Sequence, residues 1–272
     1  MLSVNTNVGA MVALQYLNQT NAQLNQTQNA VSTGLKVSGP KDDGAIYAIA
    51  QNMRAQVSGY QSVTDSLNRG ISTVDVALSA GQSISDLLVE MRQKALSAGD
   101  ASLDSSSRKA MDSDFTALRD QIDTIAQNAA FNGINLVDGS TNKISALASS
   151  DGSKVITVTV SSCKLDLAGL AIAGNISTAA LATAMVTTLD SAMDTVNKAL
   201  AHLAAGSKVY SIQLGFSQKL SDTVTAGIGN LVDADMAQES AQLTALQTKQ
   251  QLGIQALSIA NQAPQTVLSL FR

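Results

Sequence analysis

The sequence predicts a mainly α-helical protein, with long antiparallel helices that form a coiled coil from the two chain ends and a helical bundle with a small β-hairpin between them. Three observations support this fold class. The 272-residue chain has 3% aromatic residues and no Trp, which suits thin aliphatic cores between helices. Apolar residues recur at a 3.5-residue spacing over long stretches near both ends. A single β-branched run, Lys154 to Val160, interrupts the helical pattern.

The first predicted helix runs from about Thr6 to Val31 and ends at Gly34, because glycine commonly terminates helices. It carries an apolar stripe that is interrupted by two amide side chains. The apolar members are Ala10, Leu14, Leu17, Leu24, Val31 and Leu35, and the amides are Asn21 and Gln28.

After a connector from Gly39 to Gly44, a much longer helix is expected to extend to about Ala98, with an apolar seam of about seven heptads. The seam consists of Ile46, Ile49, Met53, Val57, Tyr60, Leu67, Ile71, Val74, Leu78 and Leu88. Three glycines, Gly59, Gly70 and Gly81, recur every 11 residues and so return to nearly the same helix face. Each costs up to ~1 kcal/mol of helix propensity against Ala, so we expect a close approach of another segment on that face.

A third helix is marked by apolar residues from Met111 to Ala129, before the Asn132-Gly133 turn signal. The β-branched run, preceded by the Asp151-Gly152 turn, is expected to pair with the segment 164–170. Helix then resumes after Ser177 and Thr178, which are good N-caps. Gly206 is predicted to break it, so that a separate helix runs from Val209 to Leu231.

The tail helix is predicted to begin near Asp235, and its stripe resembles that of the first helix. The apolar members are Met236, Leu243, Leu246, Ile254 and Leu257, interrupted by Gln250 and Asn261. Residues 1–35 and 250–271 contain no charged side chain. Two uncharged helical ends of this length indicate surfaces that other helices cover.

Composition argues against several classes of partner. Charged residues make up 14% of the chain, the net charge is −4, and there is no Lys/Arg run, so nucleic acid and anionic membrane surfaces are poor candidates. No apolar stretch reaches the ~20 residues that a membrane span needs. The first ten residues lack the features of a cleavable signal peptide. Cys163 is the only cysteine, so no intrachain disulfide is expected.

No catalytic, metal or cofactor site is predicted. His202 is the only histidine and lies beside an apolar helix stripe, and Cys163 has no histidine nearby in sequence. Two carboxylate pairs could be imagined as acid/base groups, but all four residues stand at predicted helix starts, where carboxylates cap free N–H groups. These pairs are Asp42 with Asp43 and Asp233 with Asp235.

Several separated motifs stand near the two ends of the chain. The N-terminal motifs are Val4-Asn5-Thr6-Asn7, Ala13-Leu14, Ser32-Thr33-Gly34-Leu35-Lys36-Val37, Lys41-Asp42-Asp43-Gly44-Ala45 and Phe131-Asn132-Gly133. The C-terminal motifs are Val232-Asp233-Ala234-Asp235, Ala260-Asn261-Gln262-Ala263-Pro264-Gln265 and Val267-Leu268-Ser269-Leu270. In their order and spacing these motifs resemble bacterial flagellins, and most closely the short flagellins of alphaproteobacteria. The resemblance covers about residues 1–139 and 178–272.

The resemblance implies a secreted subunit of the extracellular flagellar filament, which polymerises with copies of itself. It implies a discontinuous terminal coiled-coil domain, residues 1–38 with 233–272, and a helical-bundle domain, residues 39–232, whose β-hairpin lies near 143–170. The short middle leaves no room for outer variable domains. Further implied partners are the flagellar cap, the hook-filament junction protein, an export chaperone and the flagellar type III export apparatus.

Self-assembly is expected to bury apolar residues of the two chain ends. Ordering these ends costs on the order of 1–2 kcal/mol per residue in backbone entropy, so folding and polymerisation should be coupled. Asn21, Gln28 and Gln250 either fix the helix register by hydrogen bonding or face water in the channel. The expected assembly residues are Val8, Met11, Leu14, Leu17, Leu24, Val31, Leu243, Leu246, Ile254, Leu257, Leu268, Leu270 and Phe271.

Two further expectations concern the outer part of the molecule. In flagellins that stimulate the Toll-like receptor for flagellin, the segment aligned with Val89 to Leu96 presents two arginines and a leucine, whereas this chain has Glu90, Arg92 and Lys94. Weak receptor activation is therefore expected. A group of hydroxyl residues could carry O-glycans, as in related flagellins, or could simply be polar loop residues. They are Ser149, Ser150, Ser153, Ser161, Ser162, Ser177 and Thr178.

Three other interpretations remain open at this point. A hook-filament junction protein shares similar termini, although it normally matches the flagellin motifs less completely. An extracellular adhesin would be a solvated coiled coil that does not polymerise. An enzyme would need a cluster of polar catalytic residues, which the sequence does not offer.

Overall fold

The computed structural model describes residues 6–160 and 163–269, with side chains described as far as Gln262. Within these residues it contains six helices and four short strands, in agreement with the predicted mainly α-helical class. The chain divides into two compact units, residues 1–55 with 223–272 (unit 1) and residues 56–222 (unit 2). Each unit is described separately.

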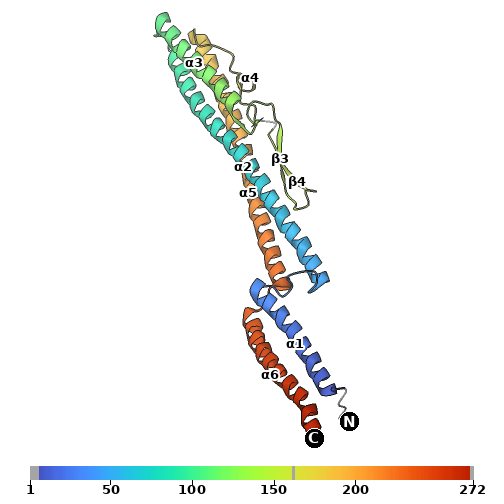
Figure 1. The fold of residues 1–272 in the computed structure, drawn as a ribbon. Coiled ribbons are helices and arrows are strands. Elements are labelled where there is room, and N and C mark those ends of the chain that lie inside the picture. Colours follow the sequence, from blue (N-terminus) through green and yellow to red (C-terminus); the bar gives the residue numbers. More distant parts are fainter. Residues whose placement is uncertain (1–5, 161–162, 270–272) are drawn as a thin grey trace. The chain divides into compact units, whose positions relative to one another are not determined.

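Unit 1 contains α1 (Val8–Thr33), α6 (Met236–Ser269), the start of α2 (Gly44–Ala98) and the end of α5 (Ala179–Val232). Asn7 caps the start of α1 by accepting a hydrogen bond from the Ala10 amide, and Gly34 ends the helix with a φ of 72°. Figure 1 shows α1 and α6 side by side. A small apolar cluster around Val37, Ala50 and Val232 joins the connector to α2 and α5.

Unit 2 contains most of α2 and α5, together with α3 (Ser105–Asn128), a short α4 (Leu167–Leu170) and two hairpins (Figure 1). Its core is aliphatic with a few large side chains, and Leu67, Ile84, Phe115 and Tyr210 are fully buried. The expected seam of α2 is largely correct, but Ile49 is exposed and the neighbouring Ala50 is buried in its place.

The three regularly spaced glycines of α2 do lie against other segments, as the sequence predicts. A Cβ atom on Gly70 would lie 3.0 Å from Tyr210 Cε2, and one on Gly81 would lie 2.7 Å from Leu200 Cδ2. A Cβ on Gly59 would overlap the carbonyl oxygen of Ser150. The backbone at Ser150 therefore approaches α2 closely at Gly59, whereas side chains of α5 approach it at Gly70 and Gly81.

The prediction that Gly206 breaks a helix is wrong, because α5 continues without interruption from Ala179 to Val232. Gly206 is buried, and a Cβ there would overlap Cγ1 of Val158. The close contact with Val158 compensates for the ~1 kcal/mol that glycine costs in a helix. The predicted separate helix from Val209 to Leu231 is the second half of α5.

The predicted strand is present as β4 (Val155–Thr159), but its predicted partner is wrong. It pairs antiparallel with β3 (Lys143–Leu147), which precedes it, and part of the segment 164–170 forms α4 instead. Buried Ile144 and Ala146 alternate with exposed residues along β3, as a half-buried strand requires. A second, two-residue hairpin, β1 (Ala130–Phe131) with β2 (Ile134–Asn135), turns at Asn132 and Gly133, both with positive φ.

The acidic pairs cap backbone amides, with one exception. Asp43 accepts hydrogen bonds from the amides of Ala45 and Ile46 at the start of α2, and Asp235 accepts them from Ala237 and Gln238 at the start of α6. Asp42 accepts from Ser38 and Gly39 in the connector, and its hydrogen bonds to Ser38, followed by the one from Gly39, lower its pKa. Asp233 follows the last residue of α5 and pairs with Leu35 in a β-bridge.

Candidate functional site

The paired chain ends form an antiparallel helix pair whose register is visible at four points. Leu17 packs on Gly253, where a Cβ would lie 3.3 Å from Leu17 Cδ1. The Gln250 amide donates to Asn21 Oδ1 at 2.7 Å, and the Asn7 amide donates to the Ala260 carbonyl at 2.7 Å. At the other end of the pair, the Ala234 amide donates to the Gly34 carbonyl at 2.9 Å.

The seam between α1 and α6 consists of small, polar and aliphatic residues. On α1 the buried residues are Thr20, Leu24, Thr27 and Ala30. The hydroxyl of Thr20 donates to the Tyr16 carbonyl at 2.9 Å, so its burial leaves no unsatisfied group. Of the three amides expected either to fix register or to face water, Asn21 and Gln250 bond to each other, whereas Gln28 is exposed.

A second apolar face on the same two helices is exposed. On α1 the side chain of Val8 is 64% exposed and that of Tyr16 is 65% exposed, and on α6 that of Ile259 is 69% exposed. We call the exposed apolar residues of these two helices, apart from Met236 at the start of α6, the terminal apolar face. Its members are Val8, Met11, Val12, Leu14, Tyr16, Leu252, Ile254 and Ile259.

The expected assembly residues therefore divide between the two faces. Six of them are buried or half-buried in the helix pair: Leu17, Leu24, Val31, Leu243, Leu246 and Leu257. Four lie on the terminal apolar face: Val8, Met11, Leu14 and Ile254. The side chain of Leu268 and the residues Leu270 and Phe271 lie outside the described part of the structure.

Sequence reasoning placed Leu14 on the buried stripe of α1, and Met236 and Ile254 on that of α6, but all three are exposed, at 47%, 44% and 54%. It also missed Val12, Tyr16, Leu252 and Ile259 on the terminal apolar face. The signal that could have found them is the presence of apolar residues on both sides of the 3.5-residue stripe. Exposed apolar side chains on a helix whose other side is already packed make a candidate contact surface.

The segment that aligns with the receptor-binding region of flagellins lies on α2 in unit 2. Arg92 Nε lies 2.5 Å from Asp190 Oδ1 on α5, and Lys94 Nζ lies 2.6 Å from Asp114 Oδ2 on α3. The hydrogen bond to Asp114 is the main cause of a raised pKa for Lys94. Both cations are therefore engaged with carboxylates of neighbouring helices, and Glu90 is exposed.

The candidate glycosylation residues are not equally accessible. Ser149 and Ser150 are half-buried, and the hydroxyl of Ser149 is bonded to Asp151, whose pKa is lowered to about 2 chiefly by that hydrogen bond. The Ser177 hydroxyl bonds Asn175 Oδ1 at 2.8 Å. Ser153 and Thr178 are exposed, although Thr178 Oγ1 accepts from the Leu181 amide at 3.3 Å and so caps α5. Ser161 and Ser162 lie outside the described residues.

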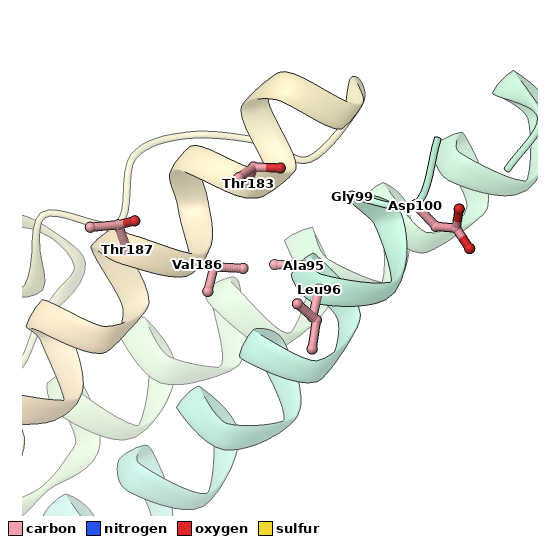
Figure 2. Close-up of a pocket in the computed structure, with 7 residues that line it drawn as sticks. All are labelled: Ala95, Leu96, Gly99, Asp100, Thr183, Val186 and Thr187. Carbon is pink, nitrogen blue, oxygen red and sulfur yellow. The ribbon is translucent and has the colours of Figure 1, made fainter. Parts of the chain in front are cut away.

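A pocket of about 380 Å³ lies in unit 2 between the end of α2 and the start of α5 (Figure 2). Apolar and hydroxyl side chains line it, with Asp100 as the one charged group: Ala95, Leu96, Gly99, Asp100, Thr183, Val186 and Thr187. A single carboxylate without a base, nucleophile or second acid does not make a catalytic arrangement.

His202 is exposed on α5. The buried Cys163 thiol donates to the Ala199 carbonyl at 3.8 Å, and burial raises its pKa to about 11. Among residues 6–160 and 163–269, no group of three His, Cys, Asp or Glu side chains could hold a metal ion. No helix in the same part of the chain is both long and apolar enough to cross a membrane.

Comparisons with known proteins identify the family to which this chain is similar. Residues 4–142 match the bacterial flagellin N-terminal helical region, and residues 186–271 match the bacterial flagellin C-terminal helical region. The chain is 52% identical to flagellin FljM of Caulobacter vibrioides over 270 residues, which is 99% of this chain and 98% of that protein. It is 37% identical to a flagellin of Brucella melitensis over the whole of both chains.

Among solved structures, a putative flagellar hook-associated protein from Vibrio parahaemolyticus has a similar fold. Its TM-score is 0.57 at 16% sequence identity, with 71% of this chain and all of that chain covered. This likeness concerns the fold alone. The two family matches and the close relatives along its whole length show that the chain belongs to the bacterial flagellin family, as a structural subunit of the flagellar filament.

Proposed function

We propose that the chain polymerises through the terminal apolar face of α1 and α6, and that the resulting polymer is the extracellular filament used for swimming. The observation that supports this proposal is the exposure of eight large apolar side chains on α1 and α6. These two helices also pack against each other along a narrow seam. A soluble monomer rarely exposes a large apolar patch without a partner for it.

The energetics favour a coupling of folding to assembly. Burying one large aliphatic or aromatic side chain contributes about 1.5–3 kcal/mol. Backbone ordering opposes this with about 1–2 kcal/mol per residue. The seam between α1 and α6 buries Leu24 and Leu246 beside Thr20, Thr27 and Ala30, and so offers limited apolar area against this entropy. Contacts of the terminal apolar face with neighbouring subunits supply the additional burial.

We further propose the discontinuous terminal domain, residues 1–38 with 233–272, as the part that forms the filament core. The hydrogen bond between Ala234 and Gly34 supports this division, because it closes the helix pair where α1 ends and α6 is about to begin. Residues 39–232 then form the surrounding bundle. By family resemblance, we also propose an export chaperone, the flagellar type III export apparatus, the cap and the junction protein as partners.

A hook-filament junction protein is the second candidate. Family membership weakens it, because the closely related chains of similar length are flagellins. Expression in a bacterium that lacks its own flagellins would separate the two. A flagellin restores long filaments and swimming, whereas a junction protein restores neither.

The decisive experiment compares the chain with variants Met11→Asp and Ile254→Asp in that host. Ser153→Asp serves as a matched control, because Ser153 is exposed in the hairpin turn of unit 2. Electron microscopy should show long filaments for the wild-type chain and the control, and short filaments or none for the two test variants. Normal filaments from both test variants would show that the terminal apolar face is not needed for assembly.

A further inference from the structure

One face of α2 in unit 2 is acidic. The segment 70–91 contains Asp75, Asp86 and Glu90 but no Lys or Arg, and all three carboxylates are exposed. The exposed side chain of Val89 lies among them. We call Asp75, Asp86, Val89 and Glu90 the acidic face.

The exposed face of α5 is basic and apolar. The segment 195–221 contains Lys198, Lys208 and Lys219 but no Asp or Glu. Three large apolar side chains, Val209, Ile212 and Phe216, lie at helical spacing and are 46%, 64% and 53% exposed. We call Lys198, Lys208, Val209, Ile212 and Phe216 the basic face.

Four charges of the two faces, those of Asp75, Asp86, Lys198 and Lys208, form no ion pair within the described part of the subunit. Among the described residues the ion pairs are Arg92 with Asp190, Lys94 with Asp114, Arg119 with Asp120 and Lys164 with Asp166. None of them includes Asp75, Asp86, Lys198 or Lys208. An exposed apolar group flanked by charge of one sign has the character of a protein contact surface.

We propose that the acidic face of one subunit docks on the basic face of a second copy of this chain. The proposal rests on the proposed function, because a helical polymer needs a heterologous contact in which two different faces of the same molecule meet. The opposite charge of the two faces identifies the partner as another copy.

The spacing of the charges supports this pairing. Asp75 and Asp86 are 11 residues apart, and Lys198 and Lys208 are 10 residues apart. At about 1.5 Å per residue, each pair spans about 15–16 Å along its helix. Two carboxylates can therefore lie opposite two ammonium groups along one pair of helices. The charges select the partner and its orientation, and the apolar side chains contribute burial.

A charge exchange tests the pairing. The acid-reversed chain carries Asp75→Lys and Asp86→Lys, the base-reversed chain carries Lys198→Glu and Lys208→Glu, and the combined chain carries all four. The combined chain keeps the wild-type net charge, because two gained lysines replace the two that are lost. Purified chains are polymerised at low salt, and the sedimented filament is measured. Each single-face variant should yield at least about tenfold less filament than wild type, a difference of about 1.4 kcal/mol.

The combined chain should polymerise like wild type, and so should an equimolar mixture of the two single-face variants. A control chain with Asp120→Lys and Asp123→Lys carries the charge change of the acid-reversed chain on α3. Circular dichroism of each monomer confirms that its helices are retained. Ile212→Ser with Phe216→Ser should reduce filament yield without changing the monomer spectrum.

The outcomes distinguish this inference from the proposed function. If the wild-type chain does not polymerise, the proposed function fails. If the wild-type chain polymerises and both single-face variants polymerise as well as it does, the pairing of faces is refuted. A combined chain that polymerises as poorly as the single-face variants also refutes it, because restored complementarity should restore assembly.

Discussion

The seam between α1 and α6 in unit 1 and the core of unit 2 are both built between long helices, yet they bury different kinds of side chain. Unit 2 buries large residues completely, among them Leu67, Phe115 and Tyr210. The seam in unit 1 buries Leu24 and Leu246 beside Thr20, Thr27 and Ala30, while other large apolar residues of the same helices face outward. The difference teaches that helical periodicity alone does not indicate a self-sufficient core. Unit 2 has the interior of an independently stable bundle, and the α1–α6 pair has an interior that is too thin without neighbours.

Deletion of the chain ends should give the largest effect on this comparison. A chain without residues 1–30 and 245–272 keeps all of unit 2. We expect a helical, soluble monomer that unfolds cooperatively and does not polymerise, as measured by circular dichroism, sedimentation and electron microscopy. Loss of helix in unit 2 would show that the ends also support the bundle.

A carboxylate placed in the α1–α6 seam should have the next largest effect. Leu17→Asp or Leu257→Asp removes an apolar contact worth about 1.5–3 kcal/mol when fully buried, and it leaves a desolvated charge in every subunit. We expect monomers with normal unit 2 stability but short filaments or none. Motility halos and electron microscopy would measure this, and filaments of normal length would contradict it.

Glycine substitutions in α5 sharpen the account of unit 2. Gly206→Ala places a Cβ against Val158 and should destabilise the monomer by about 1–3 kcal/mol. Gly215→Ala is the matched control, because no atom lies within 4 Å of its added Cβ, and it should stabilise the helix by about 0.5–1 kcal/mol. Urea unfolding of the monomer gives both values. Equal effects of the two substitutions would show that the close contact between Gly206 and Val158 does not explain the need for glycine at this position.

The smallest expected effect concerns the outer surface of unit 2. Arg92 and Lys94 are held by Asp190 and Asp114, and Glu90 reverses the charge expected at its position. We expect the monomer to activate the Toll-like receptor for flagellin only weakly, in a reporter-cell assay against an enterobacterial flagellin. Glu90→Arg with Lys94→Leu should increase the response. Equal potency of the unmodified chain would refute this expectation.

Local patterns were sufficient to predict most helices, and non-local contacts explain the failures. The seam of α2 follows from the regular spacing of its apolar residues, and the end of α1 follows from the glycine at position 34. Both signals are local in sequence, so both features could be predicted. Gly206 could not, because its compensation comes from Val158 on a strand distant in sequence. The partner of β4 was mispredicted for a related reason. Tyr210 donates to the Ile144 carbonyl at 2.7 Å and helps to hold β3 on α5, a contact that the strand sequence does not contain.

The sequence located apolar residues on α1 and α6, but it did not show which of them are buried between the two helices and which are exposed. Leu14 and Leu17 both fit an apolar stripe, yet Leu17 packs on Gly253 while Leu14 is largely exposed. The three-residue offset between them is about 60° short of a full turn, which is enough to place one side chain in the seam and the other outside it. A single chain cannot show which of two apolar stripes meets its own partner helix.

The hydrogen bond between Asn21 and Gln250 has a consequence for the conditions under which the two ends of the chain can stay together. Both groups are neutral amides, so neither gains nor loses a proton over the range in which carboxylates and amines titrate. Dissolved ions screen attractions between full charges much more than they weaken a short contact between neutral dipoles. The contribution of this hydrogen bond to the alignment of α1 with α6 is thus insensitive to pH and to salt concentration, which suits a filament exposed to external water of varying composition.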